Sequence, residues 1–76
     1  MNTTEIQSMA METVGKLTRS ANSIDDGEKM LYRAANDLRD VAPDLCDEIY
    51  STIYKLNLVI DQARAMADDI AEAHGL

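Results

Sequence analysis

The stretch that decides the fold is PDLCDEIYSTIYKLNLVIDQARAMADDIAEAHG, which runs from Pro43 to Gly75. Its apolar residues recur at intervals of three or four, the spacing that keeps side chains on one face of an α-helix. The series consists of Leu45, Ile49, Ile53, Leu56, Ile60, Ala63, Ala67 and Ile70. At 1.5 Å per residue the helix is roughly 45 Å long, more than a lone three-helix core of this size usually covers. The length therefore predicts a packing partner.

Signals at both ends of this stretch set the bounds of the helix. Ala42 precedes a proline, which pushes its backbone out of the α region, and Pro43 suits the first turn of a new helix. At the other end, His74 lies in the last turn and Gly75 stands at the left-handed capping position. The sequence therefore predicts a helix over about residues 43–74.

A first helix is predicted at the start of the chain. Thr3 or Thr4 can cap it, and an apolar series with helical spacing begins at Ile6. We expect this helix over about residues 4–22.

Turn-forming residues follow the first helix. Residues 22–27 read NSIDDG, and Asp25 followed three positions later by Glu28 is a capping-box pattern. We expect the chain to reverse here and a second helix to begin. The fold class is therefore all-α, a single domain over residues 1–76 that forms a helical hairpin or a three-helix bundle with a long C-terminal helix. The expected helices cover about residues 4–22, 26–41 and 43–74.

Composition limits the core and the choice of partners. The chain has 76 residues, no Trp, no Phe and only three Tyr, so its core is thin and self-association into a homodimer or higher oligomer is expected. Fourteen acidic against seven basic side chains give a formal charge of −7, which repels nucleic acid and anionic membranes and favours basic protein surfaces. A lone cysteine and the absence of a long apolar run indicate a cytoplasmic protein without membrane binding.

A second apolar row lies on the last helix, nearly opposite its main stripe. It consists of Tyr50, Tyr54 and Leu58, each four residues from the next. One interpretation is that these residues pack against the first helix, as a long helix in a bundle contacts neighbours on two sides. The other is a partner interface, because tyrosine supplies a large contact area at a low entropic cost.

Carboxylates form an acidic face along the same helix. One interpretation is an ordinary solvated surface. The other is a nucleic-acid decoy, since carboxylates three or four residues apart are separated by about 5 to 6 Å on a helix. In size and charge the chain resembles small acidic phage proteins that block host defence nucleases. The residues of this face are Asp44, Asp47, Glu48, Asp61, Asp68, Asp69 and Glu72.

The side chains present in the sequence argue against a catalytic or metal-binding site. There is one His and one Cys, so nucleophilic triads and paired metal ligands are missing, and the acidic residues lack the order of a calcium loop. We therefore expect no catalytic, cofactor or metal site.

The hypothesis favoured by the sequence is a small protein-binding regulator or inhibitor that occludes a basic or mixed apolar-basic partner surface, encoded by a phage or other mobile element. The alternatives are a nucleic-acid mimic of the anti-CRISPR or anti-restriction type and a self-assembling structural subunit.

Overall fold

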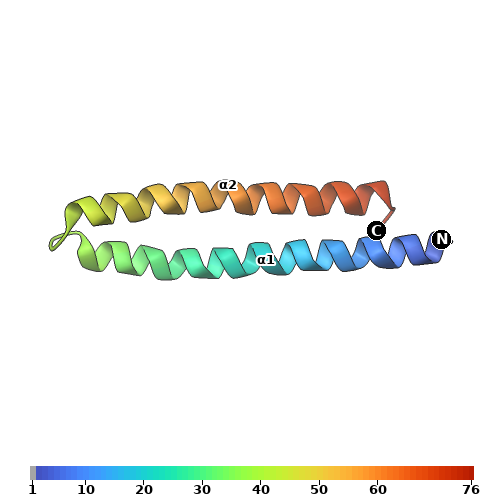
Figure 1. The fold of residues 1–76 in the computed structure, drawn as a ribbon, viewed down its shortest axis with the longest axis horizontal. Coiled ribbons are helices and arrows are strands. Elements are labelled where there is room, and N and C mark those ends of the chain that lie inside the picture. Colours follow the sequence, from blue (N-terminus) through green and yellow to red (C-terminus); the bar gives the residue numbers. More distant parts are fainter. Residues whose placement is uncertain (1) are drawn as a thin grey trace.

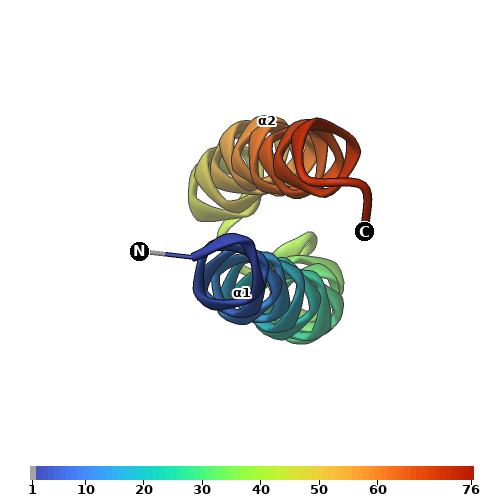
Figure 2. The ribbon, with the colours of Figure 1, turned by 90° about the vertical axis from the view of Figure 1, so that its right-hand side faces the viewer.

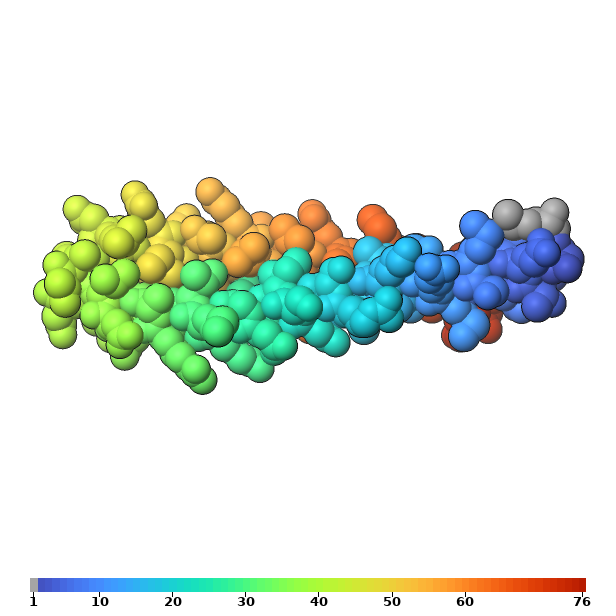
Figure 3. Space-filling model, turned by 60° about the horizontal axis from the view of Figure 1, so that its bottom comes forward, coloured from blue at the N-terminus to red at the C-terminus, as the bar shows by residue number. Residues whose placement is uncertain are grey.

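The computed structural model describes residues 2–76 as two long antiparallel helices (Figure 1). Helix α1 spans Thr3–Leu38 and helix α2 spans Pro43–Ala73, joined by a turn at residues 39–42. The result is a rod of 59 × 15 × 14 Å in which the helices touch along their length (Figure 3). Its radius of gyration is 17.3 Å, whereas a compact domain of this length has one of about 11 Å.

The predicted division into three helices is wrong. The structure has two helices, and the segment 22–27, where a turn was expected, lies inside α1. Local turn signals there are weak, since a glycine inside a helix costs only about 1 kcal/mol, and α1 packs on α2 on both sides of the segment. Glu28, expected as a capping residue at a new helix start, is buried against α2 instead.

The ends of the helices agree more closely with the sequence. Asn2, rather than Thr3 or Thr4, caps α1, because its side-chain oxygen accepts a hydrogen bond from the Glu5 amide at 2.9 Å. Pro43 begins α2 as predicted.

The C-terminal stop signal of α2 is also confirmed. Gly75 has a φ of +65°, its amide donates to the Glu72 carbonyl, and the Leu76 amide donates to the Ala71 carbonyl. This pair of bonds is the Schellman arrangement, which requires the left-handed backbone that glycine adopts without strain.

A seven-residue repeat explains why the helices stay in contact over the whole rod. In each helix the residues facing the partner helix alternate steps of three and four, the a and d positions of heptads written abcdefg. Such a repeat makes two helices wrap slightly around each other, and the end view shows the shallow crossing (Figure 2). The a and d residues of α1 are Ala10, Val14, Leu17, Ala21, Ile24, Glu28, Leu31, Ala35 and Leu38; those of α2 are Cys46, Ile49, Ile53, Leu56, Ile60, Ala63, Ala67 and Ile70.

We call the interface formed by these a and d residues the seam. It has few large apolar side chains, as the composition predicted. Four of its most buried apolar residues are alanines, and Cys46, rather than Leu45, takes the first buried position of α2. Among the described apolar residues only Ile53 and Ile60 are large and almost completely buried.

The two-helix fold predicts opposite effects for two glycine substitutions. Gly27→Ala should stabilise the protein by about 0.5 to 1 kcal/mol, because an added Cβ meets no atom within 4 Å and alanine favours a helix interior. In a domain of this size, each kcal/mol of added stability raises Tm by about 4 to 8 °C. Gly75→Ala, the matched control, should destabilise, because its φ of +65° strains any other residue. Thermal unfolding followed by circular dichroism measures both changes in stability. A loss of stability in Gly27→Ala would contradict the continuous helix and support a turn at residues 22–27.

Candidate partner-binding surface

The seam has two flanks with different chemistry. The e positions of both helices lie on one side and the g positions on the other. Polar contacts that α1 and the turn make with α2 lie along the e side, which we call the clasped flank. Its side-chain contacts join Asn22 to Arg64, Glu28 to Asn57, and Arg39 to Tyr50.

The centre of the clasped flank is a buried carboxylate. Glu28 occupies an a position and exposes only 4% of its surface. The Asn57 amide, oriented so that both side chains are satisfied, donates from its nitrogen to both Glu28 oxygens at 2.8 Å. Because α2 supplies this donor, the pair ties the two helices together in one register.

Within the predicted row of Tyr50, Tyr54 and Leu58, the structure gives Tyr50 different surroundings from the other two residues. Tyr50 is half-buried in the clasped flank, where its ring centroid lies 6.0 Å from that of Tyr32 at an interplanar angle of 59°. Its hydroxyl accepts a hydrogen bond from Arg39 Nη2 at 3.0 Å, and this bond raises the pKa of Arg39. Tyr50 therefore contributes to contacts within the hairpin.

Tyr54 and Leu58 face solvent on the outer side of α2. They expose 65% and 47% of their surfaces, and Tyr54 follows Tyr50 by one helical turn. We call Tyr32, Tyr50, Tyr54 and Leu58 the tyrosine surface, since it brings together all three tyrosines of the chain. Tyr32 and Arg39 were not among the predicted site residues. Their places follow from the heptad register of α1, which a turn at residues 22–27 would have broken.

All seven predicted acidic residues are exposed, and they form two groups. Helix α2 carries seven acidic and two basic side chains, whereas α1 carries six and four. The excess negative charge therefore lies on α2. No carboxylate occurs between Glu48 and Asp61, and the tyrosine surface has its α2 residues in this interval. The groups are Asp44, Asp47 and Glu48 near the turn, and Asp61, Asp68, Asp69 and Glu72 toward the other end.

A groove lies at the end of the rod away from the turn. Its volume is about 340 Å³, and its lining is mostly apolar: Ile6, Met9, Ala10, Thr13, Ile70 and His74. Cys46 is buried at the opposite end, far along the rod from the single histidine.

Within residues 2–76, no three His, Cys, Asp or Glu side chains cluster closely enough to hold a metal ion. Neither α1 nor α2 contains an apolar segment long enough to cross a membrane. Comparison of the chain with protein-family models, curated proteins and solved structures finds no match in any of the three.

Proposed function

We propose that the chain is a protein-binding module that acts through the tyrosine surface, as a regulator or inhibitor that covers part of a partner protein. The observation that carries the proposal is the exposure of Tyr54 and Leu58 on a helix that already buries a separate stripe in the seam. An exposed aromatic beside an aliphatic side chain is a common centre of protein interfaces.

The surrounding charge selects the kind of partner. Acidic groups stand on α2 on both sides of Tyr54, roughly 20 Å apart along the helix between Glu48 and Asp61. A partner with an apolar centre and basic edges matches this pattern, because opposite charges at the rim speed association and orient the complex. The same pattern disfavours nucleic acid, whose phosphates are also negative.

The interruption of the acidic face favours the tyrosine surface over a nucleic-acid mimic. A mimic needs carboxylates at intervals close to the phosphate spacing of a few ångströms. In α2 the interval from Glu48 to Asp61 contains no carboxylate, and its only charged side chain is Lys55. A basic channel would find two separate acidic groups there instead of one continuous line of charge.

The test begins with a photo-reactive phenylalanine analogue in place of Tyr54 in the full chain. Irradiation in the native cell should crosslink a specific partner. The same analogue at Met11, an exposed apolar position on α1, serves as the matched control and should not capture that protein.

With the purified partner, Tyr54→Ala should cost about 2 kcal/mol of affinity, roughly a 30-fold rise in Kd, as truncation of an aromatic anchor does. Met11→Ala should change Kd by less than about twofold. The affinity should largely survive an increase in salt, whereas a mimic loses affinity steeply. Binding that survives both Tyr54→Ala and high salt would contradict the proposal and the mimic together.

A further inference from the structure

We propose that the flank opposite the tyrosine surface is the interface with a second copy of this chain, packed antiparallel to form a four-helix bundle. This flank holds the g positions of both helices, and we call it the uncharged flank. Its members are Ile6, Thr13, Ser20, Gly27 and Ala34 on α1, and Leu45, Thr52, Val59, Met66 and Ala73 on α2.

The absence of charge distinguishes this flank from the flanks of a typical two-stranded coiled coil. In a two-stranded coiled coil, the e and g positions are commonly charged because they border water. None of the ten g residues in α1 and α2 carries a charge, in a chain where 28% of residues do. An apolar face that extends from a and d to g is the pattern of a helix in a larger bundle.

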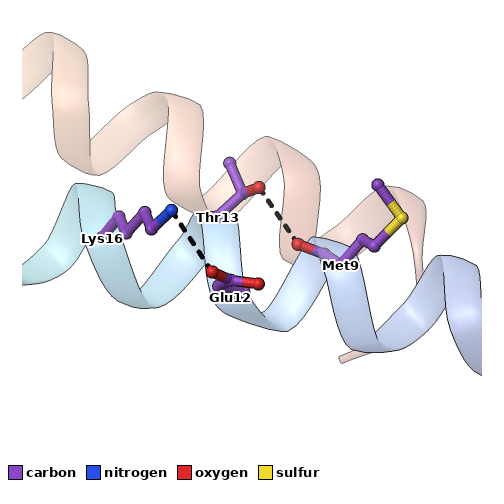
Figure 4. A network of polar contacts seen from close by, with 4 residues as sticks. All are labelled: Met9, Glu12, Thr13 and Lys16. Carbon is purple, nitrogen blue, oxygen red and sulfur yellow. Dashed lines mark hydrogen bonds and ion pairs between the residues drawn. The ribbon is translucent and has the colours of Figure 1, made fainter.

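The two threonine hydroxyls of the flank, on Thr13 and Thr52, do not need a solvent or partner contact. Thr13 Oγ1 donates to the Met9 carbonyl of its own helix at 3.0 Å (Figure 4). Thr52 Oγ1 donates in the same way to the Glu48 carbonyl at 3.0 Å. These bonds satisfy both hydroxyl donors, so the threonines can be covered by apolar groups at little cost. The ion pair of Lys16 with Glu12 lies beside this row on the same helix (Figure 4).

The flank also complements itself when a second copy is turned end to end. At the end of the rod away from the turn, the apolar groove of about 340 Å³ is lined in part by Ile6 and Thr13 of the flank. At the turn end, Leu45 of the same flank is exposed, and the neighbouring Val41 exposes 80% of its surface. A twofold axis across the middle of the rod places the turn end of each copy over the groove of the other. Each contact between a residue of one copy and a residue of the other then occurs twice, as twofold symmetry demands.

Charge and area both favour a second copy as the occupant. Two chains of charge −7 repel each other through their acidic faces, so the flank without carboxylates is the side on which they can approach. A face of 59 × 15 Å covers roughly 900 Å², close to the ~800 Å² per partner of a standard stable interface. The pairing leaves the tyrosine surface free on the other side of each hairpin.

Sedimentation equilibrium of the full chain tests the proposal. The expected species has twice the chain mass of 8.4 kDa. Val59→Glu combined with Met66→Glu should raise the Kd of dimerisation at least about 30-fold, since it buries like charges in the interface. Met11→Glu is the matched control on the clasped flank and should leave Kd unchanged. Circular dichroism should show that all three proteins remain helical, because the substituted side chains are exposed in the single hairpin.

The orientation is tested with one spin label per copy, on Val41→Cys in a chain that also carries Cys46→Ala. An antiparallel pair places the two labels about one rod length apart, 59 Å, and a parallel pair places them at less than half that distance. A monomer at micromolar concentration, a short label distance, or a dimer that survives the double Glu variant would each overturn the proposal. Loss of dimerisation in Tyr54→Ala would assign self-association to the tyrosine surface instead and would likewise overturn it.

Discussion

Substitution of Asn57 by leucine is expected to lower the free energy of unfolding by about 3 kcal/mol. Asn57 donates both hydrogen bonds that the buried Glu28 carboxylate receives across the seam. Leucine removes these donors and covers the carboxylate with an apolar group, and a buried charged group left without its hydrogen-bond donor is costly. Urea unfolding followed by circular dichroism measures the loss. Asn36→Leu, at an exposed position of α1, is the matched control and should change stability by less than about 0.5 kcal/mol.

A gain in the free energy of unfolding, instead of a loss, is expected when the Glu28 carboxylate itself is replaced. Glu28→Leu should stabilise the hairpin by about 1 to 3 kcal/mol, because a well-packed apolar residue often replaces a buried charge with a gain. Added to Asn57→Leu, it should remove the loss that the single change causes. A Glu28→Leu protein less stable than the native chain would contradict this account and show that the pair is a net source of stability.

The cost of this pair suggests that it serves specificity. A buried polar residue at an a position commonly fixes register and partner choice. Parallel association of two α1 helices would bring Glu28 against its own copy, and a shift of α2 by one heptad would move Asn57 away from the carboxylate. Both arrangements leave a buried charge without a donor. The native pairing is the arrangement that satisfies it.

The course of α2 could be predicted from the sequence because its signals are local and agree with one another. Pro43 fixes its own φ at a helical value, Gly75 adopts the left-handed backbone that other residues avoid, and the apolar spacing between them is regular. The structure confirms both ends and the all-helical class.

The course of α1 could not be predicted in the same way because its local and long-range preferences conflict. Residues 22–27 favour a turn, but the a and d positions Ala21, Ile24 and Glu28 keep their spacing through the segment. Contact with α2 over the full length outweighs a local preference of about 1 kcal/mol. The stronger signal was the seven-residue register, which becomes visible only when the segment is treated as helix.

The same register decides which parts of the candidate site were accessible to sequence reasoning. Tyr54 and Leu58 lie far from the seam on a helical wheel, and their exposure agrees with that. Tyr50 is at an e position, at the border of the seam, so its contact with Tyr32 depends on how α1 is aligned with α2. That alignment is a property of the pair of helices and of the turn between them, and neither helix alone encodes it.

Ile60→Ala is expected to cost about 3 to 4 kcal/mol, a large part of the stability of so small a protein. Ile60 exposes only 2% of its surface, and the seam around it relies on alanines that offer little area to compensate. Leu58→Ala, two residues away on the exposed side of α2, removes a side chain of the same size and should cost less than about 0.5 kcal/mol. Urea unfolding at one fixed protein concentration compares the two, since self-association makes stability depend on concentration. Equal losses in both variants would mean that Leu58 is buried in solution, and a small loss in Ile60→Ala would mean that the seam of α1 and α2 is not the core of the protein.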